Sequence, residues 1–190
     1  MSTNDNTIRK IAVIVGSLRK GSYNRTMALA LKELAPKSLD LEIVEIGDLP
    51  LYNPDLEGED IPGPWLRFRK ELSAADGVLF LTPEYNRSVP SVLKNAIDVG
   101  SRPYGSSAWE GKPGAVASLS PGKLGAFGAN HHLRQSLVFL DIPVMQQPEA
   151  YVGGAGSLFG DDGEIVNDGT REFMTKFINA FANWVERHLA

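Results

Sequence analysis

IAVIVGSLRKGSYN, residues 11–24, joins an apolar run to a polar loop that contains two glycines. The run from Ile11 to Val15 is continuous and rich in β-branched residues, which predicts a strand buried on both faces. After the loop, residues 26–35 place apolar side chains on one helical face until Pro36 ends the helix. A strand, a short loop and a helix together open a parallel crossover unit.

The same alternation of strand and helix continues along the chain. Further strands are expected at residues 41–46, 78–82 and 114–119 and, interrupted by Pro143, within 138–145. Helices are expected at residues 65–72 and 89–99 and along a final, largely aromatic stripe of Phe173, Phe177, Phe181, Trp184 and Val185. Residues 48–64 are rich in Pro, Asp and Gly and are predicted to form a long surface loop. The pattern predicts an α/β fold, a doubly wound five-stranded parallel sheet with helices on both faces.

Length and composition predict one domain over residues 1–190, with residues 1–8 as a flexible tail. The 19 basic and 23 acidic residues leave a net charge of −4 without long runs of either sign, which argues against nucleic acid as a partner. No apolar segment is long enough for a membrane helix, and the first residues lack the pattern of a secretory signal. A cytoplasmic protein without membrane contact is therefore expected.

Thiol and metal chemistry find little support in the sequence. The absence of cysteine excludes disulfides, thiolate nucleophiles, iron–sulfur clusters and cysteine-bound zinc, so any redox chemistry must come from a bound cofactor. His131 and His132 are adjacent and point in different directions on a helix, so a solvated or packed pair is expected rather than a metal site. Residues 153–163 are expected to be a flexible loop whose role the sequence leaves open.

In a doubly wound sheet, ligands bind beyond the carboxyl ends of the strands, here in the loops after Val15, Leu81 and Leu119. The first of these loops leads directly into a helix, whose N-terminal amides and dipole favour an anion. It also carries further hydrogen-bond donors, namely Ser17, Arg19, Ser22 and Asn24. These groups suit a phosphate, although a strand-to-helix turn also uses Gly, Ser and Asn simply to turn and to cap.

Two common nucleotide motifs do not fit this loop. A triphosphatase loop requires Lys directly after its last glycine, whereas Ser22 follows Gly21. A dinucleotide fingerprint requires G-x-G-x-x-G, and the second glycine position after Gly16 is Leu18. What remains is a terminal monophosphate held by hydroxyls, amides and Arg19.

The other two loops are also polar and contain turn-forming residues. The second reads TPEYN over residues 82–86 and lies where a flat ring would lie if a phosphate occupied the first. A proline-initiated turn with a surface tyrosine is its simpler interpretation. The third reads SLSPGKLG over residues 118–125. Three such loops at the expected strand ends favour a shared ligand site over three unrelated turns.

These motifs resemble the NADPH-dependent FMN reductases and, within that family, the branch of quinone and chromate reductases. The similarity rests on residues 16–24 and 82–86, with SVP at 88–90, LKNAID at 93–98 and HLRQ at 132–135. It implies a flavodoxin-like fold with FMN as cofactor. By this resemblance the residues that bind FMN would be Ser17, Leu18, Arg19, Ser22, Tyr23 and Asn24 at the phosphate, and Pro83, Glu84, Tyr85, Asn86, Ser118, Leu119, Ser120 and Gly122 along the ring.

The resemblance further implies hydride transfer from NADH or NADPH to FMN, followed by two-electron reduction of a quinone, or of chromate or another metal oxyanion. No side chain need act as an acid, a base or a nucleophile. Tyr85 and Arg102 would line the substrate pocket, with a solvated Arg102 as an equal alternative. A homodimer or homotetramer is expected, because Arg87, Val89 and Pro90 join Tyr85 in a group that suits a partner surface.

Two other functions stay open. A flavodoxin-like electron carrier would bind FMN but no nicotinamide nucleotide, and such carriers are usually far more acidic than this chain with its net charge of −4. A non-catalytic protein that binds an anion or serves as a subunit would use the same loops without turnover.

Overall fold

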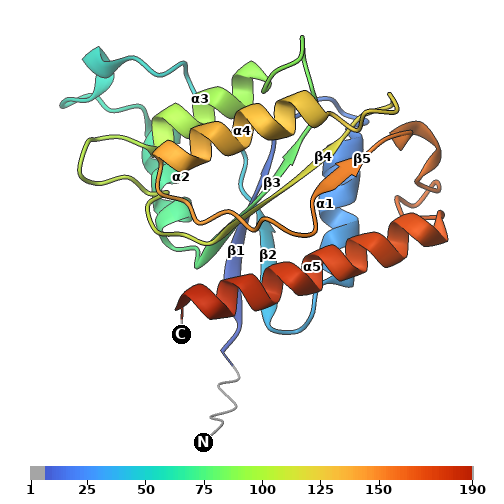
Figure 1. The fold of residues 1–190 in the computed structure, drawn as a ribbon. Helices are drawn as coiled ribbons and strands as arrows, with labels where there is room; N and C mark the ends of the chain where they lie inside the picture. The colour runs from blue at the N-terminus through green and yellow to red at the C-terminus, as the bar shows by residue number, and fades with distance from the viewer. Residues whose placement is uncertain (1–6, 190) are drawn as a thin grey trace, which may run out of the picture.

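The structure, a computed structural model, describes residues 7–189, and a single sheet runs through their middle (Figure 1). Its elements in chain order are β1 (Arg9–Val15), α1 (Tyr23–Leu34), β2 (Leu39–Ile43), η1 (Pro54–Leu56), α2 (Gly63–Ser73), β3 (Gly77–Thr82), α3 (Ser91–Gly100), β4 (Gly114–Leu119), α4 (Phe127–Phe139), β5 (Ala150–Val152), η2 (Ala155–Ser157) and α5 (Asp168–Leu189). The strands have the order β2-β1-β3-β4-β5, and every neighbouring pair is parallel. This order is that of the flavodoxin-like doubly wound fold, so the predicted fold class is confirmed.

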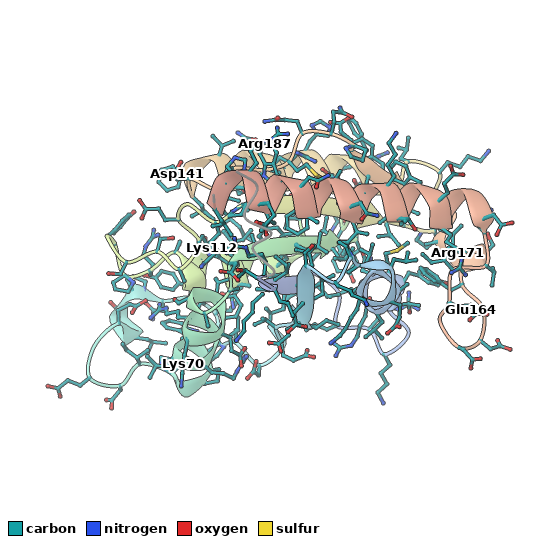
Figure 2. All side chains as sticks on the ribbon, turned by 90° about the horizontal axis from the view of Figure 1, so that it is seen from below. Lys70, Lys112, Asp141, Glu164, Arg171 and Arg187 are labelled. Carbon is teal, nitrogen blue, oxygen red and sulfur yellow. The ribbon has the colours of Figure 1, made fainter. Side chains whose placement is uncertain are left out.

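Helices cover both faces of the sheet, as predicted (Figure 1). Alternate residues of β1 enter two separate cores, because successive side chains of a strand point to opposite faces. Ile11 and Val13 pack in the core under α1 and α5, whereas Ala12 and Ile14 pack in the core under α2, α3 and α4. Figure 2 shows the same layers from below, with α5 on the opposite side of the sheet from Lys70 of α2. The uninterrupted apolar run of β1 follows from this burial on both faces.

Three strands end in register at one edge of the sheet. Val15 pairs with Leu81, and Thr82 pairs with Ser118, so β1, β3 and β4 release their loops side by side. The amide of Gly16 continues the first ladder by donating to the carbonyl of Leu81 at 2.8 Å. The loops singled out in the sequence therefore leave neighbouring strands at the same edge.

The fifth strand is not where the sequence analysis placed it, so the prediction of a strand within residues 138–145 was wrong. Val138 and Phe139 belong to the last turn of α4, and Val144 forms an isolated bridge to Gly114. Pro143 lacks an amide proton and cannot donate to a ladder, which prevents this segment from extending into a strand. The edge strand β5 forms later, after the chain has turned back to β4.

Helix α4 has no single apolar stripe. Leu133 and Leu137 are buried, while Phe127, Val138 and Phe139 on its other sides are exposed. His131 and His132 were expected on a helix, but sequence periodicity gave no bounds for it, since periodicity detects an apolar face opposite a polar one.

The remaining predicted elements are confirmed with shifted ends. Helix α1 begins at Tyr23 rather than Thr26, and β2 is an edge strand over residues 39–43 rather than 41–46. Of the expected tail, residues 1–6 lie outside the described part of the chain, and β1 begins at Arg9. Within residues 7–189, no helix combines the length and the apolar character needed to cross a membrane.

Candidate functional site

Three loops leave the carboxyl edge of the sheet: loop 1 (residues 16–22) after β1, loop 2 (residues 83–90) after β3 and loop 3 (residues 120–126) after β4. Loops 1 and 2 approach closely at Gly16. A Cβ atom added to this glycine would lie 3.3 Å from the ring of Pro83, closer than most such contacts. The first two loops are therefore packed against each other rather than merely neighbours.

Loop 1 leads into a capped helix. The side-chain oxygen of Ser22 accepts the amide of Arg25 at 3.2 Å and so begins α1. The first turn of α1 contains no acidic residue, so the positive end of the helix dipole is not compensated from within the helix. Ser17 and Ser22 are buried, and the guanidinium of Arg19 lies 5.9 Å from the ring centre of Tyr23. The loop thus combines helix amides, hydroxyls and a cation.

Asn24 connects α1 to the end of β4. Its side-chain nitrogen donates to the carbonyl of Leu119 at 3.4 Å, and the residue is only 3% exposed. Its side-chain oxygen is buried and has no hydrogen-bond partner among the described residues. Buried acceptors without a partner are rare in proteins, so a ligand that carries a donor group would be favourable here.

Loop 2 begins with a tight antiparallel turn. Tyr85 and Ser88 exchange both backbone hydrogen bonds, at 3.1 and 3.0 Å. Between them, Asn86 and Arg87 have φ angles of 50° and 64°, which is the pattern of a type I′ turn. The turn leaves Tyr85 48% exposed. The predicted residues of this loop thus lie on a sharply bent backbone whose aromatic side chain faces outward.

Loop 3 is held from beneath by Ser118. The buried hydroxyl of Ser118 donates to the carbonyl of Gly125 at 2.7 Å and accepts the side-chain amide of Asn130 at 3.1 Å. Ser120 is partly exposed, and its hydroxyl donates to the carbonyl of Gly122 at 3.2 Å. Of the residues predicted around this loop, Ser120 and Gly122 lie at the surface, whereas Ser118 shapes the loop from behind.

Arg102 contacts residues outside the three loops. It follows α3, which begins after loop 2 and is 10 residues long, or about 15 Å. Its guanidinium donates to the hydroxyl of Tyr104 at 3.1 Å and lies 5.8 Å from the ring centre of Tyr52. None of these contacts is with Tyr85, and the role of Arg102 in a substrate pocket stays a prediction.

Comparisons with known proteins identify the family of the chain. The family described as NADPH-dependent FMN reductase matches residues 9–157. The chain belongs to this family. A quinone reductase of Pseudomonas putida is 66% identical over 183 residues, which cover 96% of this chain and 98% of that protein. A 2-hydroxy-1,4-benzoquinone reductase of a Burkholderia species is 47% identical, covering 93% and 96% of the two chains. FerB, a flavoenzyme NAD(P)H:(acceptor) oxidoreductase from Paracoccus denitrificans, matches with a TM-score of 0.90 and 42% identity, covering 95% and 99%.

In this FMN reductase family member, two contacts between loop 2 and α4 were not predicted from the sequence. The carboxylate of Glu84 accepts the amide of Ala129 at 2.9 Å. The Nδ1 atom of His132 lies 3.0 Å from the hydroxyl of Ser88. The partners are 45 and 44 residues apart in the chain, so no local pattern could indicate them.

Each of the two histidines of α4 lies within hydrogen-bond distance of a hydroxyl group. His131 Nε2 lies 3.0 Å from the hydroxyl of Tyr151 on β5, and His132 contacts Ser88. Burial raises the pKa of Tyr151 to about 12, and a hydrogen bond with Glu149 contributes in the same direction. Over the described residues, no group of three or more His, Asp or Glu side chains could hold a metal ion.

We expect Gly125→Ala to destabilise this reductase more than Gly154→Ala. Both glycines have left-handed backbones, with φ of 57° and 65°. An added Cβ at Gly125 would lie 2.5 Å from the carbonyl carbon of Tyr151, whereas at Gly154 it would meet nothing within 4 Å. The free energy of unfolding in urea should fall by about 1 kcal/mol for Gly154→Ala and by about 3 kcal/mol for Gly125→Ala. Equal losses would show that loop 3 does not require this close approach.

Proposed function

We propose that the chain is an FMN-dependent NAD(P)H:quinone oxidoreductase in which FMN binds across loops 1, 2 and 3. One observation carries the proposal: an uncompensated helix N-terminus, Arg19 and the unpartnered buried oxygen of Asn24 gather at one sheet edge in a member of the FMN reductase family. An anion and a hydrogen-bond donor on the same ligand are needed to satisfy these groups. FMN carries both.

The phosphate of FMN fits loop 1. The first amides of α1 and the guanidinium of Arg19 favour an anion, and Ser17 and Ser22 place hydroxyls in the same loop. The side-chain oxygen of Asn24 needs a donor, which phosphate oxygens do not offer but the ribityl hydroxyls of FMN do. The remaining predicted contacts of this group are Leu18 and Tyr23.

The flat ring of FMN fits the space that loops 2 and 3 border. Pro83 to Asn86 would contact it through the backbone of the turn, and Ser120 and Gly122 would border it on the side of β4. The exposed ring of Tyr85 would then lie where a second flat molecule, a nicotinamide or a quinone, enters.

When bound, FMN supplies the redox chemistry by taking a hydride from NADH or NADPH and passing two electrons to an acceptor. The chain's own residues bind and orient the reactants, and none need act as an acid or a base. Quinones are the proposed acceptors because relatives that share 66% and 47% identity with the chain are named for quinone reduction. Chromate and other metal oxyanions are proposed as incidental acceptors.

The visible spectrum of the purified protein tests the proposal. We expect a yellow protein, or one that turns yellow with added FMN, that bleaches with NAD(P)H and regains its colour when a quinone is added. Because one pocket serves both substrates in turn, initial rates should give parallel double-reciprocal lines. A colourless protein that rejects FMN would overturn the proposal, and a yellow protein that NAD(P)H does not bleach would support the electron carrier instead.

Arg19→Ala is expected to weaken FMN binding about tenfold, because a charge-assisted contact to the phosphate is lost. Riboflavin, which lacks the phosphate, should bind equally to both proteins. Lys20→Ala is the matched control, since it removes a neighbouring exposed cation from the same loop. Fluorescence titration measures both ligands, and an unchanged FMN affinity would exclude Arg19 as a phosphate contact.

We further propose that a second copy of the chain covers the outer face of α4. Phe127, Val138 and Phe139 are 48%, 76% and 79% exposed, an apolar surface that suits a partner. This face begins at Phe127, directly after loop 3, and the first half of α4 contacts loop 2 through Ala129 and His132, so a partner on α4 would lie near the proposed acceptor pocket. Arg102 would contribute to substrate binding across such an interface rather than within its own chain.

Phe139→Glu should convert the assembly into monomers that retain FMN but lose quinone reductase activity. The matched control is Leu29→Glu, which places the same charge on α1, at a position 53% exposed on the other side of the sheet. Light scattering and activity are measured at falling protein concentration. A fully active monomer would defeat this part of the proposal.

A further inference from the structure

Helix α4 lacks a local cap at its N-terminus. It begins after Ala126, which has a left-handed backbone with φ of 60° and makes no side-chain cap hydrogen bond. The first turn of α4 also contains no acidic residue. Helix N-termini leave amides without partners and favour a nearby negative charge. The helix must therefore obtain both from elsewhere in the chain.

Glu84 of loop 2 supplies both a hydrogen-bond acceptor for these amides and a negative charge. Its carboxylate accepts the amide of Ala129 at 2.9 Å, and its side chain is 13% exposed. A Cβ added to Gly128 would lie 2.9 Å from the same carboxylate, so the glycine allows Glu84 to lie against the backbone of the first turn. Arg87, the other charged neighbour, is 3.7 Å away with a 76% exposed side chain and so contributes a weak ion pair.

The residues that follow Glu84 need such an anchor. Asn86 and Arg87 are consecutive non-glycine residues in the left-handed region, a conformation that persists only where surrounding contacts hold it. On the far side of the turn, Ser88 contacts His132, one helical turn further along α4. The turn is thus fixed to α4 on both sides.

We infer that Glu84 is a positioning residue that sets the distance between loop 2 and loop 3 by holding the turn at residues 85–88 against α4. The inference rests on the proposed function, since the flat ring of FMN is proposed to lie between these loops. The side chain of Glu84 acts through α4 and the turn, whereas the backbone of loop 2 contacts the ring.

Titration of Glu84→Ala with FMN and with riboflavin tests the inference. Because both ligands share the ring, we expect both affinities to fall by the same factor, about tenfold. This separates Glu84 from Arg19, whose loss should affect FMN alone. Glu84→Gln keeps an acceptor oxygen but loses the charge, so its affinities should be intermediate, about threefold below the native protein. The resolved shoulders of the bound flavin spectrum should broaden in the same order.

Glu186→Ala is the matched control, because it removes a partly buried glutamate that pairs with Arg9 at 2.9 Å on the far side of the sheet from α4. It should leave both affinities and the spectrum unchanged. Glu84 variants with lowered thermal stability but native affinities for both ligands would overturn the inference, as would a loss confined to FMN. If Glu84→Ala does not fold, native affinities in Glu84→Gln would overturn it. Failure of the native protein to bind FMN would instead refute the proposed function.

Discussion

The common register of β1, β3 and β4 is the constraint on which the candidate site depends. Because Val15, Leu81 and Ala117 lie at the same level, three loops emerge from adjacent strands at one edge. Burial enforces this register, since a shift by one residue would exchange the side chains that face the two cores. Gly16 then permits loops 1 and 2 to approach, because any larger residue would press on Pro83. A ligand can therefore contact all three loops without a conformational change in the sheet.

Local patterns predicted the parts of the site that are built locally. The strand from Ile11 to Val15 and the phosphate-type loop after it are contiguous in sequence, so composition and order were enough to place them. The start of α1 was set too late because the predicted helix was located from its apolar spacing, whereas Ser22 begins it by capping. The predicted ring-side residues depended on resemblance to the FMN reductase family, since TPEYN alone is more simply interpreted as a turn.

Long-range contacts account for what the sequence could not predict. Ser118 was predicted to lie along the ring, and in the structure its hydroxyl contacts Gly125 and Asn130; no local pattern indicates which side of loop 3 a serine will take. Strand β5 was missed because Pro143 and the end of α4 interrupt the segment that looked most apolar. Arg102 was predicted to reach a pocket completed by a partner, and in the structure it follows α3 and contacts Tyr52 and Tyr104.

Helix α4 joins these observations physically. Its inner face packs in the core through Leu133 and Leu137, its N-terminus binds Glu84, and its outer face exposes Val138 and Phe139. A helix with exposed apolar side chains gains stability when a partner covers them, and a helix without its own cap depends on the group that caps it. A partner that covered the outer face would therefore also stabilise the helix to which loop 2 is fixed. Assembly and the geometry of the flavin pocket would then both depend on α4, so that loss of the partner would also weaken the anchoring of loop 2.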